Sequence, residues 1–277
     1  MLTGALAAAG CGGGGKPAAT AGGRTTVVAA FFPLAEAARV VGGDRVQVTN
    51  LTPPGVEPHD LELTTKAVDE VAGADVVVIM GQQFQPAVEK VAATRSSGTV
   101  EIFKALGMDG KDPHIWLDPS LMERIVGVVA DGLAHADPAH AAQFRANAKT
   151  FDAQLAALDA RFASKLAHCQ RTVIVASHEA YGYLARRYHL RQESITGLIP
   201  DAEPDPAKLD ELARLVQREH VTTVFNEPLL PKRAAETLAR EAHVKVASLD
   251  PLESDPGHGY VAAMDANLAT LAAGLGC

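Results

Sequence analysis

The sequence predicts an α/β fold of two lobes, each built around a parallel four-stranded sheet, with one long helix that joins them. Short apolar runs alternate with amphipathic helical stretches along most of the chain, which is typical of βα units and parallel sheets. The stretch 138–167 differs, because it carries apolar residues at helical spacing and has no glycine or proline in its interior. At 1.5 Å per residue, such a helix is roughly 45 Å long, enough to run the length of the molecule.

The composition is that of a folded protein with one large or two modest cores. The chain has 277 residues, of which 47% are hydrophobic. Its net charge of -8 is spread along the chain without a polybasic segment, which argues against binding to nucleic acid or to a membrane surface. We expect an amino-terminal tether at 1–23, a first lobe at 24–137, a linking helix at 138–168 and a second lobe at 169–277.

The apolar and amphipathic stretches of the first lobe alternate in the expected order. The predicted strands are 26–31, 46–51, 75–80 and 99–103, and the predicted helices are 33–41, 64–73, 85–93 and a helix that follows Pro119 and ends near Ala136.

The second lobe repeats this order. The predicted strands are 172–177, 194–199, 221–225 and 244–249, and the predicted helices are 180–188, 206–219, 231–241 and 259–275. Acidic or imidazole side chains follow these strands, so one rim of this lobe is expected to be acidic.

The first residues resemble the end of a bacterial lipoprotein signal. Small apolar residues lead directly to Cys11, and Gly12 to Gly15 then form a glycine-rich stretch typical of a tether. We expect Cys11 to be lipidated; the alternative is a frayed glycine-rich terminus. No run of eighteen apolar residues follows, so the mature protein is expected to meet the membrane through a lipid anchor only.

Cys169 and Cys277 are expected to form a disulfide bond. An exported protein can keep disulfides, and an unpaired cysteine at the last position would be reactive in an oxidising compartment. A bridge between them would attach the final helix to its own lobe. The alternative is two unrelated thiols.

Four side chains have the character of metal ligands. His178 and Asp250 each follow a predicted buried strand directly, and the carboxyl ends of strands in open α/β sheets face the ligand crevice. His59 and His114 each lie beside a proline in a loop, where an imidazole is held in place. Three imidazoles and one carboxylate from the two lobes would complete a tetrahedral zinc-type shell in the cleft between them.

Other polar residues near these positions are candidates for a supporting role. Glu227 is either a fifth ligand or, as we prefer, an acceptor that orients a histidine, and Glu57 is equally ambiguous. His258 is a candidate accessory group, and Trp116 is expected to pack under the loop that presents His114. The remaining histidines are interpreted as surface or helix-end residues: His135, His140, His168, His189, His220 and His243.

Six motifs, taken in order, resemble those of the zinc and manganese solute-binding proteins of ABC importers, the ZnuA/TroA-type family. They are Glu57-Pro-His-Asp60, Pro113-His-Ile-Trp-Leu-Asp-Pro119, the run Ser177-His-Glu-Ala-Tyr-Gly-Tyr-Leu-Ala-Arg-Arg-Tyr188, Glu203-Pro-Asp-Pro206, Phe225-Asn-Glu227 and Leu249-Asp-Pro-Leu252. The resemblance runs from about Arg24 to Cys277. It implies two α/β lobes joined by one long helix, with metal held by His59, His114, His178 and Asp250.

The resemblance implies an extracytoplasmic, cell-surface or periplasmic lipoprotein, a monomer, that delivers a metal ion to an ABC permease and its ATPase. Three neutral imidazoles favour Zn²⁺, whereas Mn²⁺ prefers a site richer in oxygen, so zinc is expected and manganese is the alternative. A metal-binding adhesin would share the fold. A zinc hydrolase is disfavoured, because catalytic zinc sites leave one position open and neither a zincin helix nor a Gly-x-Ser-x-Gly elbow is present.

Overall fold

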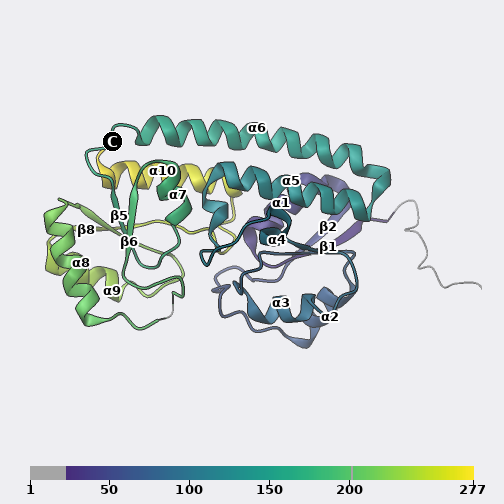
Figure 1. The fold of residues 1–277 in the computed structure, drawn as a ribbon, viewed down its shortest axis with the longest axis horizontal. Coiled ribbons are helices and arrows are strands. Elements are labelled where there is room, and N and C mark those ends of the chain that lie inside the picture. Colours follow the sequence, from purple (N-terminus) through teal and green to yellow (C-terminus); the bar gives the residue numbers. More distant parts are fainter. Residues whose placement is uncertain (1–22, 201) are drawn as a thin grey trace, which may run out of the picture.

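The computed structural model describes residues 23–200 and 202–277. Cys11 lies outside these residues, as does most of the predicted tether. The described part forms two α/β lobes lying side by side, with α6 running above both of them (Figure 1). The predicted fold class of two parallel four-stranded sheets is therefore confirmed.

The first lobe contains a parallel sheet of order β2-β1-β3-β4. Its elements are β1 (Thr25–Ala29), α1 (Phe32–Gly42), β2 (Val46–Asn50), α2 (Thr65–Gly73), β3 (Val76–Ile79), α3 (Pro86–Ala92), β4 (Thr99–Glu101), α4 (Ile102–Leu106), the 3₁₀ turn η2 (Ile115–Leu117) and α5 (Pro119–Ala136).

The second lobe has the equivalent strand order, β6-β5-β7-β8. Its elements are β5 (Val173–Ala176), α7 (Gly182–Arg187), β6 (Arg191–Ser194), α8 (Pro206–Arg218), β7 (Thr223–Asn226), α9 (Arg233–Ala242), β8 (Lys245–Ser248) and α10 (Tyr260–Leu275). In both lobes the first strand pairs with the second and third, so each sheet has its switch in strand order beside its first strand.

The linking helix α6 spans Ala141–Leu166 and follows a short 3₁₀ turn, η3 (Pro138–His140). Its buried side chains recur every three or four residues, which places them on one face. That face packs against α5 and α1 of the first lobe and against α10 of the second. A single hydrophobic core consequently extends from the first sheet, under α6, to the near face of the second sheet. A smaller core lies on the other face of the second sheet, under α8 and α9.

Two predicted strands need correction. The prediction of a strand at 194–199 was wrong, because β6 ends at Ser194. It is an edge strand that pairs only with β5, so its polar side chains can face solvent, while the apolar residues that suggested a strand lie beyond it, with Ile199 64% exposed. The strand predicted at 99–103 ends at Glu101, because Ile102 and Phe103 are buried as the first turn of α4.

The disulfide between Cys169 and Cys277 is present, as predicted. It joins the segment before β5 to the residue that ends the chain after α10. Backbone hydrogen bonds from Gln170 to Gly276 and from Arg171 to Leu275 continue the same attachment. Among the described helices, none is long and apolar enough to span a membrane.

Candidate metal centre

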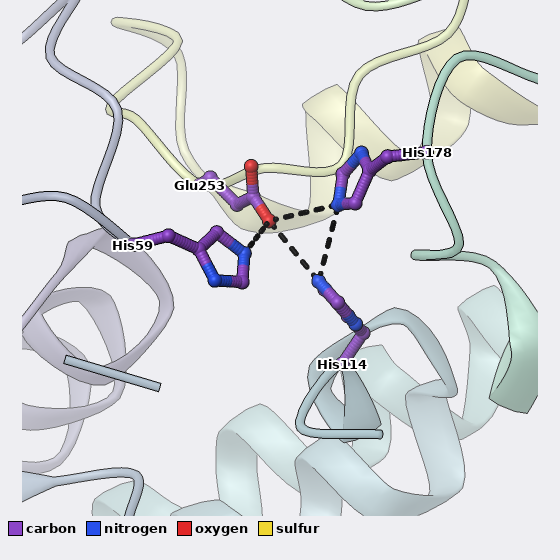
Figure 2. Close-up of side chains that lie close together, drawn as sticks. All are labelled: His59, His114, His178 and Glu253. Carbon is purple, nitrogen blue, oxygen red and sulfur yellow. Dashed lines mark hydrogen bonds and ion pairs between the residues drawn. The ribbon is translucent and has the colours of Figure 1, made fainter. Parts of the chain in front are cut away.

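Three histidines and one glutamate converge between the two lobes (Figure 2). His59 comes from the loop between β2 and α2, and His114 from the loop between α4 and η2. His178 follows β5 with one residue between, and Glu253 lies in the loop between β8 and α10. Each of the four offers one ligand atom, and these atoms all lie within 4.8 Å of one another. In the part of the chain that the structure describes, this is the only such group.

The three imidazoles present the same ring atom to the centre. Glu253 Oε1 lies 3.2 Å from His59 Nε2, 3.2 Å from His114 Nε2 and 3.4 Å from His178 Nε2. His114 Nε2 and His178 Nε2 are 3.2 Å apart. Because the three Nε2 atoms and one carboxylate oxygen face a common point, the group has the donor set and convergence of a four-coordinate site.

Asp112 fixes the orientation of His114. Its Oδ1 accepts hydrogen bonds from the main-chain N–H of His114 at 3.0 Å and from ring Nδ1 at 2.8 Å. With Nδ1 carrying the proton, Nε2 keeps its lone pair and faces Glu253 and His178. Sequence reasoning missed Asp112, although its place two residues before His114 in an Asp-Pro-His run is a detectable signal for a carboxylate that bonds the backbone two residues on.

Glu227 does the same for His178. One carboxylate oxygen accepts from the main-chain N–H of His178 at 2.9 Å, and the other bonds the ring Nδ1. Gln192 on β6 adds a bond from Nε2 to the carbonyl of His178 at 3.2 Å. Glu227 is thus placed as an orienting acceptor and lies outside the group of four converging ligand atoms.

His59 is the most accessible of the four side chains. Its side chain is 9% exposed, whereas those of His114 and His178 are 0% exposed and that of Glu253 is 1% exposed. The ring packs edge-on against Phe84 at a centroid distance of 4.5 Å, and the main-chain N–H donates to Glu57 Oε1 at 3.2 Å. Glu57 therefore supports the His59 loop, and the accessible edge of the site lies on the first lobe.

The structure does not bring Asp250 into the group, and Glu253 takes the place predicted for it. Asp250 Oδ1 accepts a hydrogen bond from the main-chain N–H of Leu252 at 2.8 Å, so this carboxylate caps a turn. Leu252 adopts a left-handed conformation, with φ 60°, which reverses the chain after Pro251. The reversal directs the next side chain, Glu253, toward the histidines.

His258, the candidate accessory group, also lies outside the group. It is exposed, and its ring Nδ1 donates to the carbonyl of Pro256 at 2.8 Å. Trp116 packs near His114 as expected, with ring centroids 5.1 Å apart, but it also donates a hydrogen bond to Pro251 that sequence reasoning did not foresee.

The pKa values of His114, His178 and Glu253 depend on one another. Burial alone lowers the pKa of His178, but the charges of Glu253 and Glu227 outweigh it and raise the pKa well above 6.5. The pKa of His114 is also raised: burial again opposes the shift, and hydrogen bonds to Asp112 and Glu253 overcome it. Burial would raise the pKa of Glu253, yet the three histidines hold it well below 4.5. The pocket is therefore strongly favourable to positive charge.

A comparison with family models matches residues 27–274 to ZnuA, described as the zinc-uptake complex component A, periplasmic. The chain belongs to this family. The match covers both lobes and the linking helix, and it includes all four converging residues.

Individual ZnuA-family proteins show similarity at a moderate level. The zinc-binding lipoprotein AdcA of Streptococcus pneumoniae is 32% identical over 269 residues, which cover 87% of this chain and 54% of AdcA. The high-affinity zinc uptake system protein ZnuA of Bacillus subtilis is 29% identical over 269 residues, covering 87% of this chain and 84% of that protein. The chain thus spans about half the length of the streptococcal AdcA proteins that it matches.

A solved ZnuA-type structure superimposes on most of the chain. The laminin-binding protein Lmb of Streptococcus agalactiae, described as a bifunctional protein with adhesin and metal transporting activity, has a TM-score of 0.84 at 28% identity. The superposition covers 91% of this chain and 99% of Lmb.

Proposed function

We propose that the chain is the zinc-binding component of an ABC importer, which captures one Zn²⁺ outside the cytoplasm and delivers it to a permease and its ATPase. The observation that carries the proposal is the convergence of three buried Nε2 atoms and one carboxylate oxygen between the lobes. The names of AdcA and ZnuA, which describe zinc binding and zinc uptake, support it.

The proposed ligands are His59, His114, His178 and Glu253. Three imidazoles favour zinc over manganese, because manganese prefers a larger share of oxygen ligands. Asp112 and Glu227 hold two of the imidazoles in the tautomer that leaves Nε2 free to bind. The ion would replace protons as the positive charge beside Glu253.

We propose binding without catalysis. Four protein donors surround one point, whereas catalytic zinc sites keep a position open for water or substrate. Adhesin activity is described for Lmb and is not part of this proposal.

Three further parts of the proposal concern organisation. The chain divides into a tether at 1–23, lobes at 24–137 and 169–277, and a linking helix at 138–168. Lipidation of Cys11 would hold the protein at the outer face of a membrane, and the protein would act as a monomer. Mass spectrometry of the native protein would detect the lipid on Cys11.

Elemental analysis of the chain, purified without added metal, tests the proposal, followed by zinc titration against a chromophoric chelator. We expect one zinc per chain. Glu253→Gln and His114→Ala should each weaken zinc binding at least about tenfold, as loss of a ligand does. Asp250→Asn, which keeps the oxygen that caps Leu252, is the matched control and should bind like the wild type. A chain purified without bound zinc, or a larger loss of zinc affinity with Asp250→Asn than with Glu253→Gln, would refute the proposed function.

Delivery to an importer has a separate test. Zinc-loaded protein should stimulate ATP hydrolysis by the proposed permease and ATPase, reconstituted in lipid vesicles. The metal-free protein is the control. Equal rates of ATP hydrolysis with the zinc-loaded and the metal-free protein would exclude this transport role.

A further inference from the structure

The segment 249–253 delivers Glu253 to the site, and hydrogen bonds from both lobes hold its backbone. It follows β8, the last strand of the second lobe, and then crosses to the first lobe. Leu249 and Leu252 are fully buried, and the polar backbone groups around them find side-chain partners in Tyr181, Asn267 and Asp250.

The first lobe holds the segment through Trp116. The indole Nε1–H donates to the carbonyl of Pro251 at 2.7 Å, two residues before Glu253. Trp116 itself lies two residues after His114, and its ring packs against Phe31 and Phe84 at centroid distances of 4.7 and 5.4 Å. The loop that presents one histidine ligand therefore also holds the segment that presents the carboxylate ligand.

The second lobe holds the same segment through Tyr181. The hydroxyl donates to the carbonyl of Leu249 at 2.8 Å, and Tyr181 lies three residues after His178. Both Trp116 and Tyr181 are 0% exposed, so neither hydrogen bond competes with solvent. The segment is thus attached to residues that lie two or three positions after two of the histidine ligands.

Asn267 on α10 completes the attachment. Its side chain accepts from the main-chain N–H of Asp250 at 3.0 Å and donates to the carbonyl of Asp250 at 2.6 Å. Asp250 in turn caps Leu252, whose left-handed conformation needs such support. These hydrogen bonds stabilise the observed conformation of the turn.

Contacts beyond Glu253 also reach the first lobe. The main-chain N–H of Gly55 donates to Ser254 Oγ at 2.8 Å, and Arg39 forms an ion pair with Asp255 at 3.6 Å. Tyr260 donates from its hydroxyl to the carbonyl of Trp116 at 2.6 Å, so Trp116 is bonded on both sides. Glu253, which belongs to the second lobe by sequence, is therefore positioned by both lobes.

We infer that Trp116 and Tyr181 are positioning residues for zinc binding, which fix the Glu253 carboxylate by holding the carbonyls of Pro251 and Leu249. The inference rests on the proposed function. Without either hydrogen bond, the turn samples other conformations and Glu253 occupies the ligand position for less of the time, while the three histidines keep their own supports, Asp112 and Glu227 among them.

The test is a double-mutant cycle on zinc affinity, measured by chelator competition with the purified chain. Trp116→Phe keeps an aromatic ring but removes the indole donor, and Tyr181→Phe removes only a hydroxyl. Each should weaken zinc binding about fivefold to tenfold, the effect of losing one buried hydrogen bond. Tyr188→Phe is the matched control, because it removes a hydroxyl that bonds Asp159 at 2.9 Å, away from the segment, and should leave affinity unchanged.

The cycle separates positioning from general structural damage. In a Glu253→Gln background, Trp116→Phe and Tyr181→Phe should cause no further loss beyond about twofold, because the ligand that they position is already absent. The same loss in both backgrounds would overturn the inference while leaving zinc binding intact. Failure of the wild-type chain to bind zinc would overturn the proposed function as well. If Trp116→Phe does not fold, as judged by its melting curve, Tyr181→Phe decides alone.

Discussion

Glu227 bonds His178 twice, through the main-chain N–H and through ring Nδ1, although the two residues are 49 positions apart. They follow β5 and β7, which are neighbours in the sheet, so the carboxyl ends of two adjacent strands supply a ligand and its support. Glu227 is only 1% exposed, so water does not compete for its two hydrogen bonds.

Replacement of Glu227 by glutamine should weaken zinc binding by about tenfold to a hundredfold, the usual effect of losing the partner of a ligating histidine. The two hydrogen bonds use different carboxylate oxygens, so a glutamine side chain in the same position places an NH₂ donor against one of the two N–H groups of His178. Glu193→Gln is the control, since Glu193 pairs with exposed Arg191. Chelator competition measures both variants, and equal affinities would show that His178 needs no such support.

Zinc affinity should fall as pH is lowered, and the fall should begin above pH 6.5. The pKa values of His114 and His178 are raised in the metal-free protein, so protons compete with zinc for the Nε2 lone pairs already at near-neutral pH. Competition titrations across about pH 8.5 to 5.5 would measure this. An affinity that does not change over this range would indicate a site dominated by oxygen ligands.

The same two histidines make the stability of the metal-free protein change with pH in the opposite direction to zinc affinity. A histidine whose pKa is raised by folding stabilises the folded state below its unfolded value near 6.5, and this stabilisation is lost as pH rises through the folded pKa. The melting temperature without metal should therefore decrease as pH rises from about 6.5 to 8.5, while that of the zinc-loaded protein should not. Parallel curves for the two forms would argue against linked protons.

Reduction or removal of the disulfide should lower stability but not zinc affinity. The bridge closes a segment of 108 residues, which contributes about 4 to 5 kcal/mol in the chain-entropy model, with measured values often smaller. It lies at the amino end of β5, and His178 lies beyond the carboxyl end. The double variant Cys169→Ser/Cys277→Ser should melt at a lower temperature and bind zinc normally. Two reactive thiols in oxidised, denatured wild type would disprove the bridge.

Much of this fold follows from local sequence patterns, because strand and helix periodicity report burial on a sheet or a helix face. The central strands are continuous apolar runs that are buried at every position, and the buried residues of α6 recur every three or four positions. The edge strand β6 could not be located in this way. Its position depends on register with β5, and its side chains are polar or partly exposed.

The ligands of the metal site also differ in whether local sequence predicts them. The three histidines are predictable, because each lies after a strand or beside a proline in a loop. Glu253 is not, since its direction depends on the left-handed Leu252 and on Trp116, which lies 135 residues from its partner Pro251. Asp250, directly after the strand, was the better candidate by sequence, but its carboxylate is used to cap the turn.

The two lobes should move little relative to each other on metal binding. One hydrophobic core extends across both sheets beneath α6, and α6 has no interior glycine or proline at which to bend. Small-angle scattering curves of metal-free and zinc-loaded protein should nearly superimpose. A clear decrease in the radius of gyration with zinc would instead indicate closure of the lobes about a hinge.

The central claim is that one ion binds between the lobes through three imidazoles and Glu253. A crystal structure of the zinc-loaded chain, with anomalous difference density recorded at the zinc edge, tests it most directly. We predict one peak at about 2.0 to 2.2 Å from His59 Nε2, His114 Nε2, His178 Nε2 and a carboxylate oxygen of Glu253. A peak bound by Asp250 in place of Glu253, or one located outside this group, would contradict the account.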